Sequence, residues 1–522
     1  MLAIGRALGV ALLLAAASAF IPAPIAPRHD LRGVAAPVAA RRHLLAPALR
    51  MQADSSMQEE LLAAAAASRA ELQASGVAAD VRVPTLASLA ADRDNGAGLE
   101  ALRSMPAVDF AASIEDDVYA APEPLFKMLP KGADRTAQRV ASFAFQQGED
   151  QVALSAEEVR AVASSGVGLA DFSHSGIIAV TGADRFRFVN GLCTNKVLDA
   201  KPGQVIASCF TTKLGRCVDL TSVAVLHDSI LILCSASRCQ HLYQAMDALI
   251  FPKDDVQIED MSLAFARFQV VGPEAAPIVA ASLDGPCALP SPQQLSAWGE
   301  SGLLIAGSGL ASPGYTILVP ASSAAASWRH LSTRLRQLDC PAARLLGSNE
   351  WEILRVLQGV PAPDKELTND YNPLEAALWH TVSFDKGCYL GQETIARLKT
   401  YDGIKQSLFG ISFVAVGDGE EAALSGAKLF VAQEVCTGQE GGGEGGVVAR
   451  GDGKITSVVR LDGAGCEVQA LGYVRVKSGA GVGSVVLAKG EGLPDEGVKG
   501  TLCDLDFARR SVADSSAADA DL

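Results

Sequence analysis

Apolar residues along the centre of the chain follow two periods, which together predict a mixture of strands and helices. Short apolar runs rich in β-branched residues predict strands, at Gly176–Thr181, Val205–Thr211, Val218–Val225, Ser229–Cys234, Asp255–Ile258, Ala264–Val271 and Tyr315–Val319. Apolar positions three and four apart predict helices, at Ser155–Ser164, Phe186–Val189, Leu242–Leu249, Glu274–Ala281, Trp328–Leu335 and Trp351–Leu357. No stretch shows the strand, Gly-rich turn and helix of a dinucleotide-binding fold, so we expect an α+β fold.

Polar residues ahead of three of these helices predict where each helix begins. Thr181 and Asp184 have the spacing of a capping box, in which each side chain bonds to the other residue's backbone N–H. Ser235 and Ser348 each precede an apolar periodic segment, and serine is a preferred N-cap residue. We therefore expect each serine to cap the helix that follows it.

From about Lys405 the pattern changes to short strands separated by Gly-rich turns. The strands Leu408–Phe413, Lys454–Arg460 and Leu471–Lys477 predict a small all-β barrel. The run Gly438–Gly446 contains a formal G-x-G-x-x-G, but no strand and helix flank it. We interpret it as a surface insertion and not as a dinucleotide site.

The two ends of the chain differ from the centre. Met1–Ala19 has an apolar run behind one arginine and a small-residue site, as in a secretory signal peptide, and Phe20–Met51 is arginine-rich with one acidic residue, as in a transit peptide. Together residues 1–51 resemble the bipartite leader of plastid proteins; plain secretion and a mitochondrial address are the alternatives. Residues 52–136 are expected to be an Ala-rich extension, with a helix at Gln58–Ser75, and residues 511–522 a disordered tail.

Charge and cysteine content narrow the class of protein. The 522 residues carry a formal net charge of −15 and have a sequence pI near 5.0. A general nucleic-acid binder needs a cationic face, so nucleic acid is not an expected partner. The 11 cysteines include no C-x-x-C, which favours a reducing compartment and gives no support for a bound metal. No segment after the leader is long and apolar enough to span a membrane. We also expect the protein to be a monomer.

One segment, Ser383–Thr394, is not explained by packing. Gly387 and Gly391 bracket Cys388, which allows a tight turn with close approach to a ligand. A thiol beside Lys386 and a helix N-terminus is expected to have a lowered pKa and so to be nucleophilic. Glu393, near the start of the helix, is placed to cap backbone N–H groups. The structural alternative is a Gly turn with a buried cysteine.

The residues Lys386–Glu393 match the signature K-G-C-Y/F-x-G-Q-E, and on it the chain resembles the YgfZ-type folate-binding family. These proteins assist iron–sulfur cluster assembly or repair and are relatives of the glycine-cleavage T-protein, an aminomethyltransferase. Segments on both sides are also similar to the family, at Gly168–His174, Gly182–Asp184, Phe188–Asn195, Glu366–Ala376, Ile395–Arg397, Leu408–Phe413 and Ile455–Ser457. The resemblance covers about Val162 to Phe507.

The resemblance implies a T-protein-like fold around a central tetrahydrofolate site. Two mixed α/β subdomains would occupy residues 137–404, and a C-terminal β-barrel residues 405–510. Asp219 resembles the position of the T-protein's catalytic aspartate. We expect Cys388 and Asp219 to be the reactive groups. The expected folate-binding residues are Asn195, Glu375, Lys386, Gly387, Tyr389, Gly391, Gln392, Glu393 and Arg397.

Chemical needs of a folate suggest a role for each of these side chains. Asp219 or Glu375 would accept hydrogen bonds from the pterin N–H edge, while Tyr389 would stack on its ring. Lys386 and Arg397 are expected to anchor the glutamyl tail. Asn195 and Lys213 are weaker candidates, and His174 is expected to be a structural loop histidine.

Three functions remain open from the sequence. The first is a folate-dependent factor that serves iron–sulfur assembly machinery or client proteins in the plastid. The second is an aminomethyltransferase acting on a lipoyl-bound aminomethyl group, and the third is a folate-binding module without chemistry. Cys388 favours the first, because T-protein motifs at this place resemble K-x-x-F-x-G-K/R-E and lack the cysteine.

Overall fold

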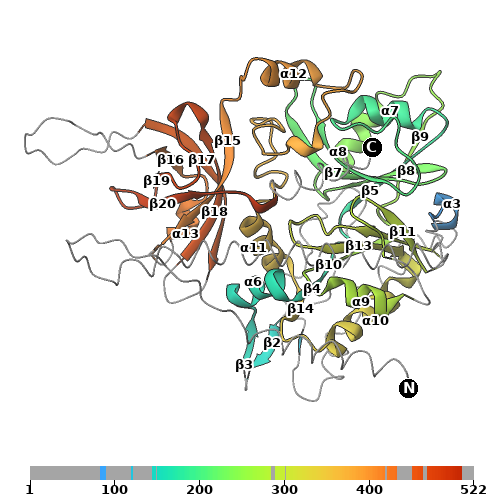
Figure 1. Ribbon diagram of the computed structural model, residues 1–522, viewed down its shortest axis with the longest axis horizontal. Helices are drawn as coiled ribbons and strands as arrows, with labels where there is room; N and C mark the ends of the chain where they lie inside the picture. The colour runs from blue at the N-terminus through green and yellow to red at the C-terminus, as the bar shows by residue number, and fades with distance from the viewer. Residues whose placement is uncertain are drawn as a thin grey trace, which may run out of the picture. The chain divides into compact units, whose positions relative to one another are not determined.

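The computed structural model describes residues 83–89, 119–120, 144–147, 150–283, 289–299, 301–414, 416–417, 420–431, 450–461 and 467–507 (Figure 1). The expected leader, the helix at Gln58–Ser75, the run Gly438–Gly446 and the tail lie outside these residues. Within the described part of the chain, none of the helices has the length and apolar character needed to cross a bilayer.

The first sheet is antiparallel, with its strands in the order β6-β7-β8-β5-β9. The strands are β5 (Gly176–Thr181), β6 (Val205–Thr211), β7 (Cys217–Val225), β8 (Ser229–Cys234) and β9 (Gln257–Asp260). Helices α7 (Arg185–Leu192) and α8 (Cys239–Asp247) pack on one face through Val189, Leu242 and Met246. Burial of these apolar side chains is what holds the helices on the sheet.

The second sheet has the order β11-β12-β13-β10-β4-β14, and only its β4–β14 pair is parallel. The strands are β4 (Val167–Asp171), β10 (Phe265–Val271), β11 (Leu295–Trp298), β12 (Gly302–Ala306), β13 (Gly314–Pro320) and β14 (Ala343–Leu346). Helices α9 (Ala275–Ser282) and α10 (Ala324–Gln337) cover one face, where Trp328 is fully buried. The other face packs against the first sheet and the short helix α3 (Leu86–Leu89).

Because β4 pairs directly with β10, the whole first sheet is an insertion between two neighbouring strands of the second sheet. The pairs run from Gly168–Val271 to Asp171–Phe268. The mixed α/β character expected from the sequence is confirmed, and each predicted strand from Gly176 to Val319 is present within a few residues of its expected bounds.

The C-terminal part is a closed barrel, as the short strands and Gly-rich turns predict. Its strand order is β15-β18-β17-β16-β19-β20. The strands are β15 (Gln406–Phe413), β16 (Lys428–Val431), β17 (Arg450–Leu461), β18 (Glu467–Arg475), β19 (Val485–Lys489) and β20 (Val498–Cys503), with α13 (Glu420–Leu424) beside them. Alternate residues such as Ile411 and Phe413 fill the interior.

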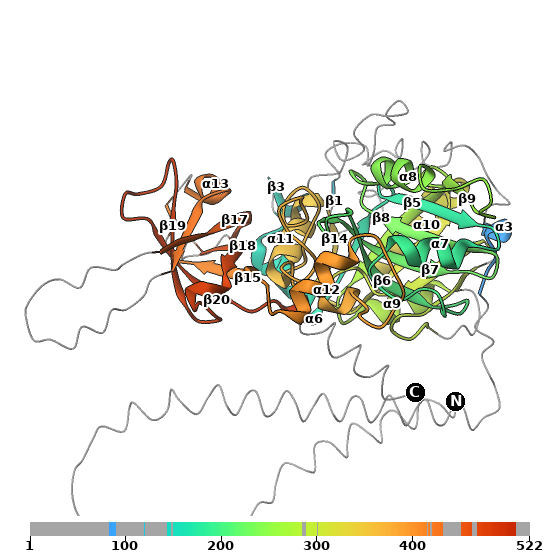
Figure 2. The same ribbon diagram turned by 90° about the horizontal axis from the view of Figure 1, so that it is seen from above.

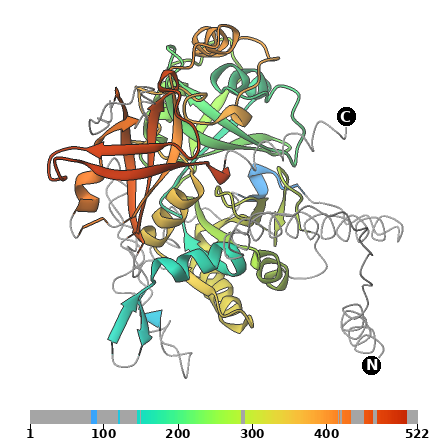
Figure 3. The same ribbon diagram turned by 60° about the vertical axis from the view of Figure 1, so that its left-hand side comes forward.

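Helix α11 (Ser348–Gln358) joins the barrel to the sheets (Figure 2). It packs against strands β17 and β18 and also against α6 (Ala156–Ser165), which lies beside it in Figure 3. Trp351 and Leu354 face α6, whereas Val356 joins the cluster that contains Tyr473 of the barrel. Residues of all three parts are therefore held at fixed positions around α11.

The helix starts show where cap prediction fails. The predicted box at Thr181 and Asp184 is wrong, since α7 begins after Asp184 without a side-chain cap and the Asp184 carboxylate accepts from Asp255 N–H instead. Ser348 is the first residue of α11, and Gly347 is its N-cap, with Glu350 accepting from Gly347 N–H at 2.8 Å. The capping box at Ser155 and Glu158 opens α6.

Candidate ligand cavity and thiol loop

A cavity of about 1090 Å³ lies where the two sheets, α11 and the segment after it meet. Protein sites for small organic ligands have volumes of roughly 300 to 1,000 Å³. Polar side chains from every one of these parts line it, among them Asn195, Asp219, Arg267, Tyr315, Arg355 and His380. The cavity is large enough for a ligand of folate size.

Asp219 lies in the wall formed by the first sheet, on β7 opposite Phe210 of β6. Its carboxylate accepts hydrogen bonds from the backbone N–H of Ser235 at 2.7 Å and from the Ser235 hydroxyl at 2.8 Å. Burial raises the pKa of Asp219 to about 6, and the two bonds from Ser235 act in the opposite direction. Ser235 therefore holds the Asp219 carboxylate in place. Its predicted role as a helix cap is wrong, because Arg238 is the N-cap of α8.

The wall formed by the second sheet carries a partly buried cation that the sequence reasoning missed. Arg267 and Gln269 alternate along β10 and both line the cavity, as does Tyr315 of β13. Burial lowers the pKa of Arg267 to about 10, and its guanidinium lies 5.9 Å from the centre of the Phe172 ring. The signal was two polar residues at alternate positions of an otherwise apolar strand, which places both on one face.

The third wall holds an ion-pair network centred on Arg355 of α11. Arg355 donates to Glu352 at 2.6 and 2.8 Å, to Glu366 at 2.9 Å and to the Ser457 hydroxyl at 2.7 Å. Glu366 also accepts from Ser457, which belongs to barrel strand β17. Lys365 pairs with Glu352 at 2.5 Å. The network joins the cavity wall to the barrel.

Lys386 of the signature is a buried structural cation. Its ammonium group donates to the carbonyl oxygens of Asn190 at 2.6 Å, Cys193 at 2.8 Å and Asn195 at 2.6 Å. Burial lowers the pKa of Lys386 to about 8. Tyr389 is buried beside it, with the ammonium 5.0 Å from the ring centre, and burial raises the pKa of Tyr389 to about 12. These two residues fasten the signature segment to the end of α7.

Gly391 occupies the left-handed region, with φ 86°, at the start of helix α12 (Gln392–Thr400). A Cβ added there would lie 2.6 Å from the Thr212 carbonyl oxygen and 2.8 Å from the Gly215 Cα. The Leu390 carbonyl next to it accepts from the Thr211 hydroxyl at 2.7 Å. The turn between β6 and β7 therefore presses directly on the signature, and only glycine fits.

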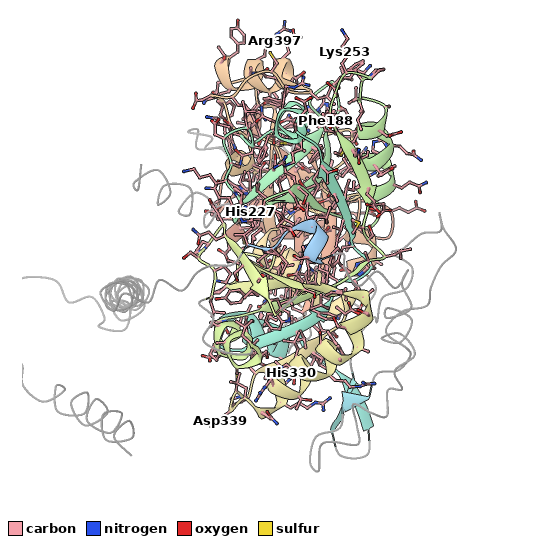
Figure 4. The ribbon with its side chains drawn as sticks, turned by 90° about the vertical axis from the view of Figure 1, so that its right-hand side faces the viewer. Phe188, His227, Lys253, His330, Asp339 and Arg397 are labelled. Atoms are coloured by element: carbon pink, nitrogen blue, oxygen red, sulfur yellow. The ribbon has the colours of Figure 1, made fainter. Side chains whose placement is uncertain are left out.

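Cys388 lies exposed on this loop, outside the lining of the cavity. Among the described residues, Gly387 has no atom within 4 Å of the place where a Cβ would stand. Glu393 and Arg397 of α12 form an exposed pair at 2.6 Å, and Arg397 projects outward from the helix in Figure 4. Gln392 is partly exposed at the first position of α12. These residues present a surface and do not line the cavity.

Glu375 is buried and closes a local turn. It accepts from Asn372 N–H at 3.2 Å, and its carboxylate lies 3.8 Å from the Arg216 guanidinium. Burial raises the pKa of Glu375. It is outside the cavity lining, so of the two carboxylates expected for a pterin edge only Asp219 belongs to that lining.

Asn195 is the residue that the cavity and the signature loop share. It lines the cavity, its carbonyl binds Lys386, and its amide donates to the backbone oxygens of Ala207 at 2.8 Å and His380 at 3.3 Å. His380 also lines the cavity, and burial lowers its pKa to about 4, which keeps the imidazole neutral. Lys213 is exposed, and His174 is buried against an aromatic ring.

The residues present fit a reduced folate. Asp219 offers a carboxylate for pterin N–H groups, and Phe172, Tyr315 and Trp351 supply aromatic surface around the same space. Arg267 supplies positive charge. An acceptor, a wall for a flat ring and a cation are the three elements that such a ligand requires.

Comparison with known proteins gives a consistent result. The profile of the GCVT N-terminal domain matches residues 134–386. A transferase-like chloroplastic protein of Arabidopsis thaliana is 34% identical over 288 residues, which cover 54% of this chain and 65% of that protein. An aminomethyltransferase of Chlorobium luteolum is 30% identical over 279 residues, covering 52% of this chain and 73% of that protein.

The fold has a solved counterpart. The glycine cleavage system aminomethyltransferase T from Bartonella henselae superposes with a TM-score of 0.54 at 20% sequence identity, covering 68% of this chain and 91% of that one. This likeness establishes the arrangement of two mixed α/β sheets and a barrel, which the sequence predicted. The match to the Arabidopsis protein spans just under two thirds of that protein's length.

Proposed function

This chain belongs to the aminomethyltransferase family, and on that premise we propose that it is a tetrahydrofolate-binding protein of the plastid that assists iron–sulfur cluster assembly or repair. The signature Lys386–Glu393 supports placing it in the YgfZ-type branch of that family. The leader-like residues 1–51 and the chloroplastic relative in Arabidopsis support the plastid location.

The observation that carries the proposal is the connection between an exposed thiol and the cavity. Cys388 is presented on the surface, and the loop that holds it is bonded through Lys386 to Asn195 in the cavity wall. A ligand in the cavity and a client protein at Cys388 could therefore be bound at the same time. T-protein motifs at this place lack the cysteine, so the exposed thiol favours the assembly function over group transfer alone.

Bound tetrahydrofolate would supply a nitrogen carrier for one-carbon units. Asp219 would orient the pterin through its N–H groups, with Ser235 fixing the carboxylate in place. The aromatic side chains would exclude water from the ring. Cys388 would act outside the cavity, on the partner protein.

The test is rescue of iron–sulfur enzyme activities in plastids that lack the protein. Wild-type chain should restore them, and Cys388→Ala should not, although it should bind tetrahydrofolate as tightly as wild type. Cys340→Ala is the matched control, because Cys340 is also partly exposed but lies outside the cavity lining and the loop. Full rescue by Cys388→Ala would remove the thiol from the proposal.

An aminomethyltransferase remains the second candidate, and a specific observation favours it. Asp219 faces the cavity with a pKa of about 6, so it can exchange a proton near neutral pH. Incubation of the purified chain with an aminomethyl-lipoyl carrier and tetrahydrofolate distinguishes the two functions. Formation of methylenetetrahydrofolate that Asp219→Asn abolishes would favour the transferase.

A further inference from the structure

Arg267 is a partly buried cation in the cavity, and it forms no ion pair with a carboxylate of the described residues. The ion pairs found among those residues do not include it. Arg355 pairs with Glu352 and Glu366, and Lys365 pairs with Glu352. Of these three cations in the lining, Arg267 alone has only neutral neighbours within hydrogen-bonding distance in the described part of the chain.

The neutral partner of Arg267 is Gln269, two residues further along β10. The Thr316 hydroxyl has one hydrogen, and it lies 2.8 Å from the Gly307 carbonyl, so Gln269 must donate its amide N–H to Thr316 at 2.7 Å. This orientation turns the Gln269 oxygen to the guanidinium, where it accepts from Nε and Nη2 of Arg267 at 3.0 Å each.

Three N–H donors of the guanidinium remain after these two bonds. Arg267 is partly exposed, and the space it faces is the cavity. Asp219 lines the same cavity from the first sheet. A desolvated cation held in this way costs stability unless a ligand supplies electron density to it.

We propose that Arg267, oriented by Gln269, is a ligand-binding residue for an electron-rich oxygen of the molecule that occupies the cavity. A guanidinium fork binds carbonyl and carboxylate oxygens through two parallel N–H donors. The cavity lining then contains a donor, Arg267, from the second sheet and an acceptor, Asp219, from the first. This inference rests on the proposed folate ligand, which carries such oxygens both on its pterin ring and on its glutamate.

The test measures binding of three probes to the full chain, namely tetrahydrofolate, a tetrahydropterin without a tail, and 4-aminobenzoylglutamate. Arg267→Met should weaken tetrahydrofolate binding at least tenfold. Equal weakening for the tetrahydropterin assigns the contact to the ring oxygen, whereas weakening for 4-aminobenzoylglutamate assigns it to a carboxylate. Either result supports the subsite.

Stability of the ligand-free chain separates a binding role from a structural one. Because Arg267→Met removes a desolvated charge that has no ion-pair partner among the described residues, the melting temperature should stay the same or rise. Arg344→Met is the control: Arg344 pairs with Glu158 outside the cavity lining, and its loss should leave affinity unchanged. Arg267→Lys, which keeps the charge and loses the fork, should bind with intermediate affinity.

Two results would overturn the inference. One is tetrahydrofolate affinity within about twofold of wild type in Arg267→Met, and the other is weaker binding together with a lower melting temperature of the ligand-free chain. If the wild-type chain binds no tetrahydrofolate, the proposed function itself fails, and the two failures are therefore distinguishable.

Discussion

Asp219 carries a charge that depends on pH in the range around pH 6. Burial raises its pKa to about 6, so the carboxylate is ionised above that value and becomes protonated below it. Only the ionised form can accept hydrogen bonds with both oxygens while Ser235 holds it. Ligand N–H groups should therefore bind best above pH 6.

We expect tetrahydrofolate affinity to be constant above about pH 7 and to fall about tenfold for each pH unit below about 6. Titrations over this range with wild type and Asp219→Asn check it. The variant should bind more weakly at high pH and lose this pH dependence. A wild-type affinity that does not change between about pH 5 and 8 would contradict the role of Asp219.

Some residues of the candidate site could be predicted from the sequence, and others could not. Asp219 and Asn195 were found from the resemblance, and both line the cavity. Lys386 was expected to bind a folate tail, yet its ammonium is occupied by three backbone carbonyls. The carbonyls belong to residues almost two hundred positions earlier, and a motif read along the chain contains no information about such a partner.

Arg267 could have been noticed from its alternation with Gln269, but its significance could not. Whether a polar face of a strand points into a cavity depends on which other elements meet there, and here they come from three distant parts of the chain. His380 is similar, since it looks like an ordinary loop residue until the fold places it in the lining.

At the scale of elements, the signature loop depends on the conformation of Gly391. Any other residue there would adopt a left-handed conformation and would also meet backbone atoms of the turn between β6 and β7. Gly391→Ala should cost about 2 kcal/mol or more in the free energy of unfolding. It should also change the rate at which a maleimide reacts with Cys388.

Gly387→Ala is the matched control in the same loop. A Cβ at Gly387 would meet no atom of the described part of the chain within 4 Å, and the φ of Gly387 is not left-handed. Urea unfolding and the maleimide rate should both stay close to wild type. If the two variants behave alike, tight packing at Gly391 is not what shapes the loop.

The strands that sequence reasoning missed are short or contain glycine. In β4, a Cβ added to Gly168 would lie 2.3 Å from the Leu346 side chain of β14, so the close pairing of these strands requires glycine. Because glycine has a low strand propensity, the sequence pattern does not indicate a strand at this position. Strand β16 contains four residues and runs from a lysine to a valine. Strand β19 contains five residues and runs from a valine to a lysine. Pairing with neighbouring strands in the closed barrel stabilises β16 and β19, and the local sequence pattern contains no information about this pairing.

At the scale of the whole molecule, Arg355 and Glu366 hold the barrel against α11. Both side chains are almost fully buried, and Glu366 also accepts from Thr456 and Ser457 of β17 at 2.6 Å. Removing one partner of a buried pair leaves a charge without compensation and typically costs about 3 to 5 kcal/mol. Glu366→Ala should therefore be strongly destabilising.

Urea unfolding and limited proteolysis check this prediction. Glu366→Ala should shift unfolding to lower urea and expose the barrel junction to protease, whereas Glu366→Leu combined with Arg355→Met should recover part of the loss. Glu467→Ala is the control, because its pair with Arg160 is exposed and contributes about 1 kcal/mol or less. Equal stability of Glu366→Ala and Glu467→Ala would show that the Arg355–Glu366 pair does not hold the barrel against α11.

From the insertion of the first sheet between β4 and β10 we expect a definite order of assembly. Residues 176–260 contain all five strands of that sheet, so it can pair its strands as soon as this stretch has left the ribosome. The second sheet must wait, because its edge strand β14 ends at Leu346 and pairs with β4 nearly 180 positions earlier. Asp219 is then in place before Arg267 and Arg355 complete the cavity. A chain halted midway would carry a finished first wall and an unpaired β4 edge, which makes it a natural substrate for chaperones.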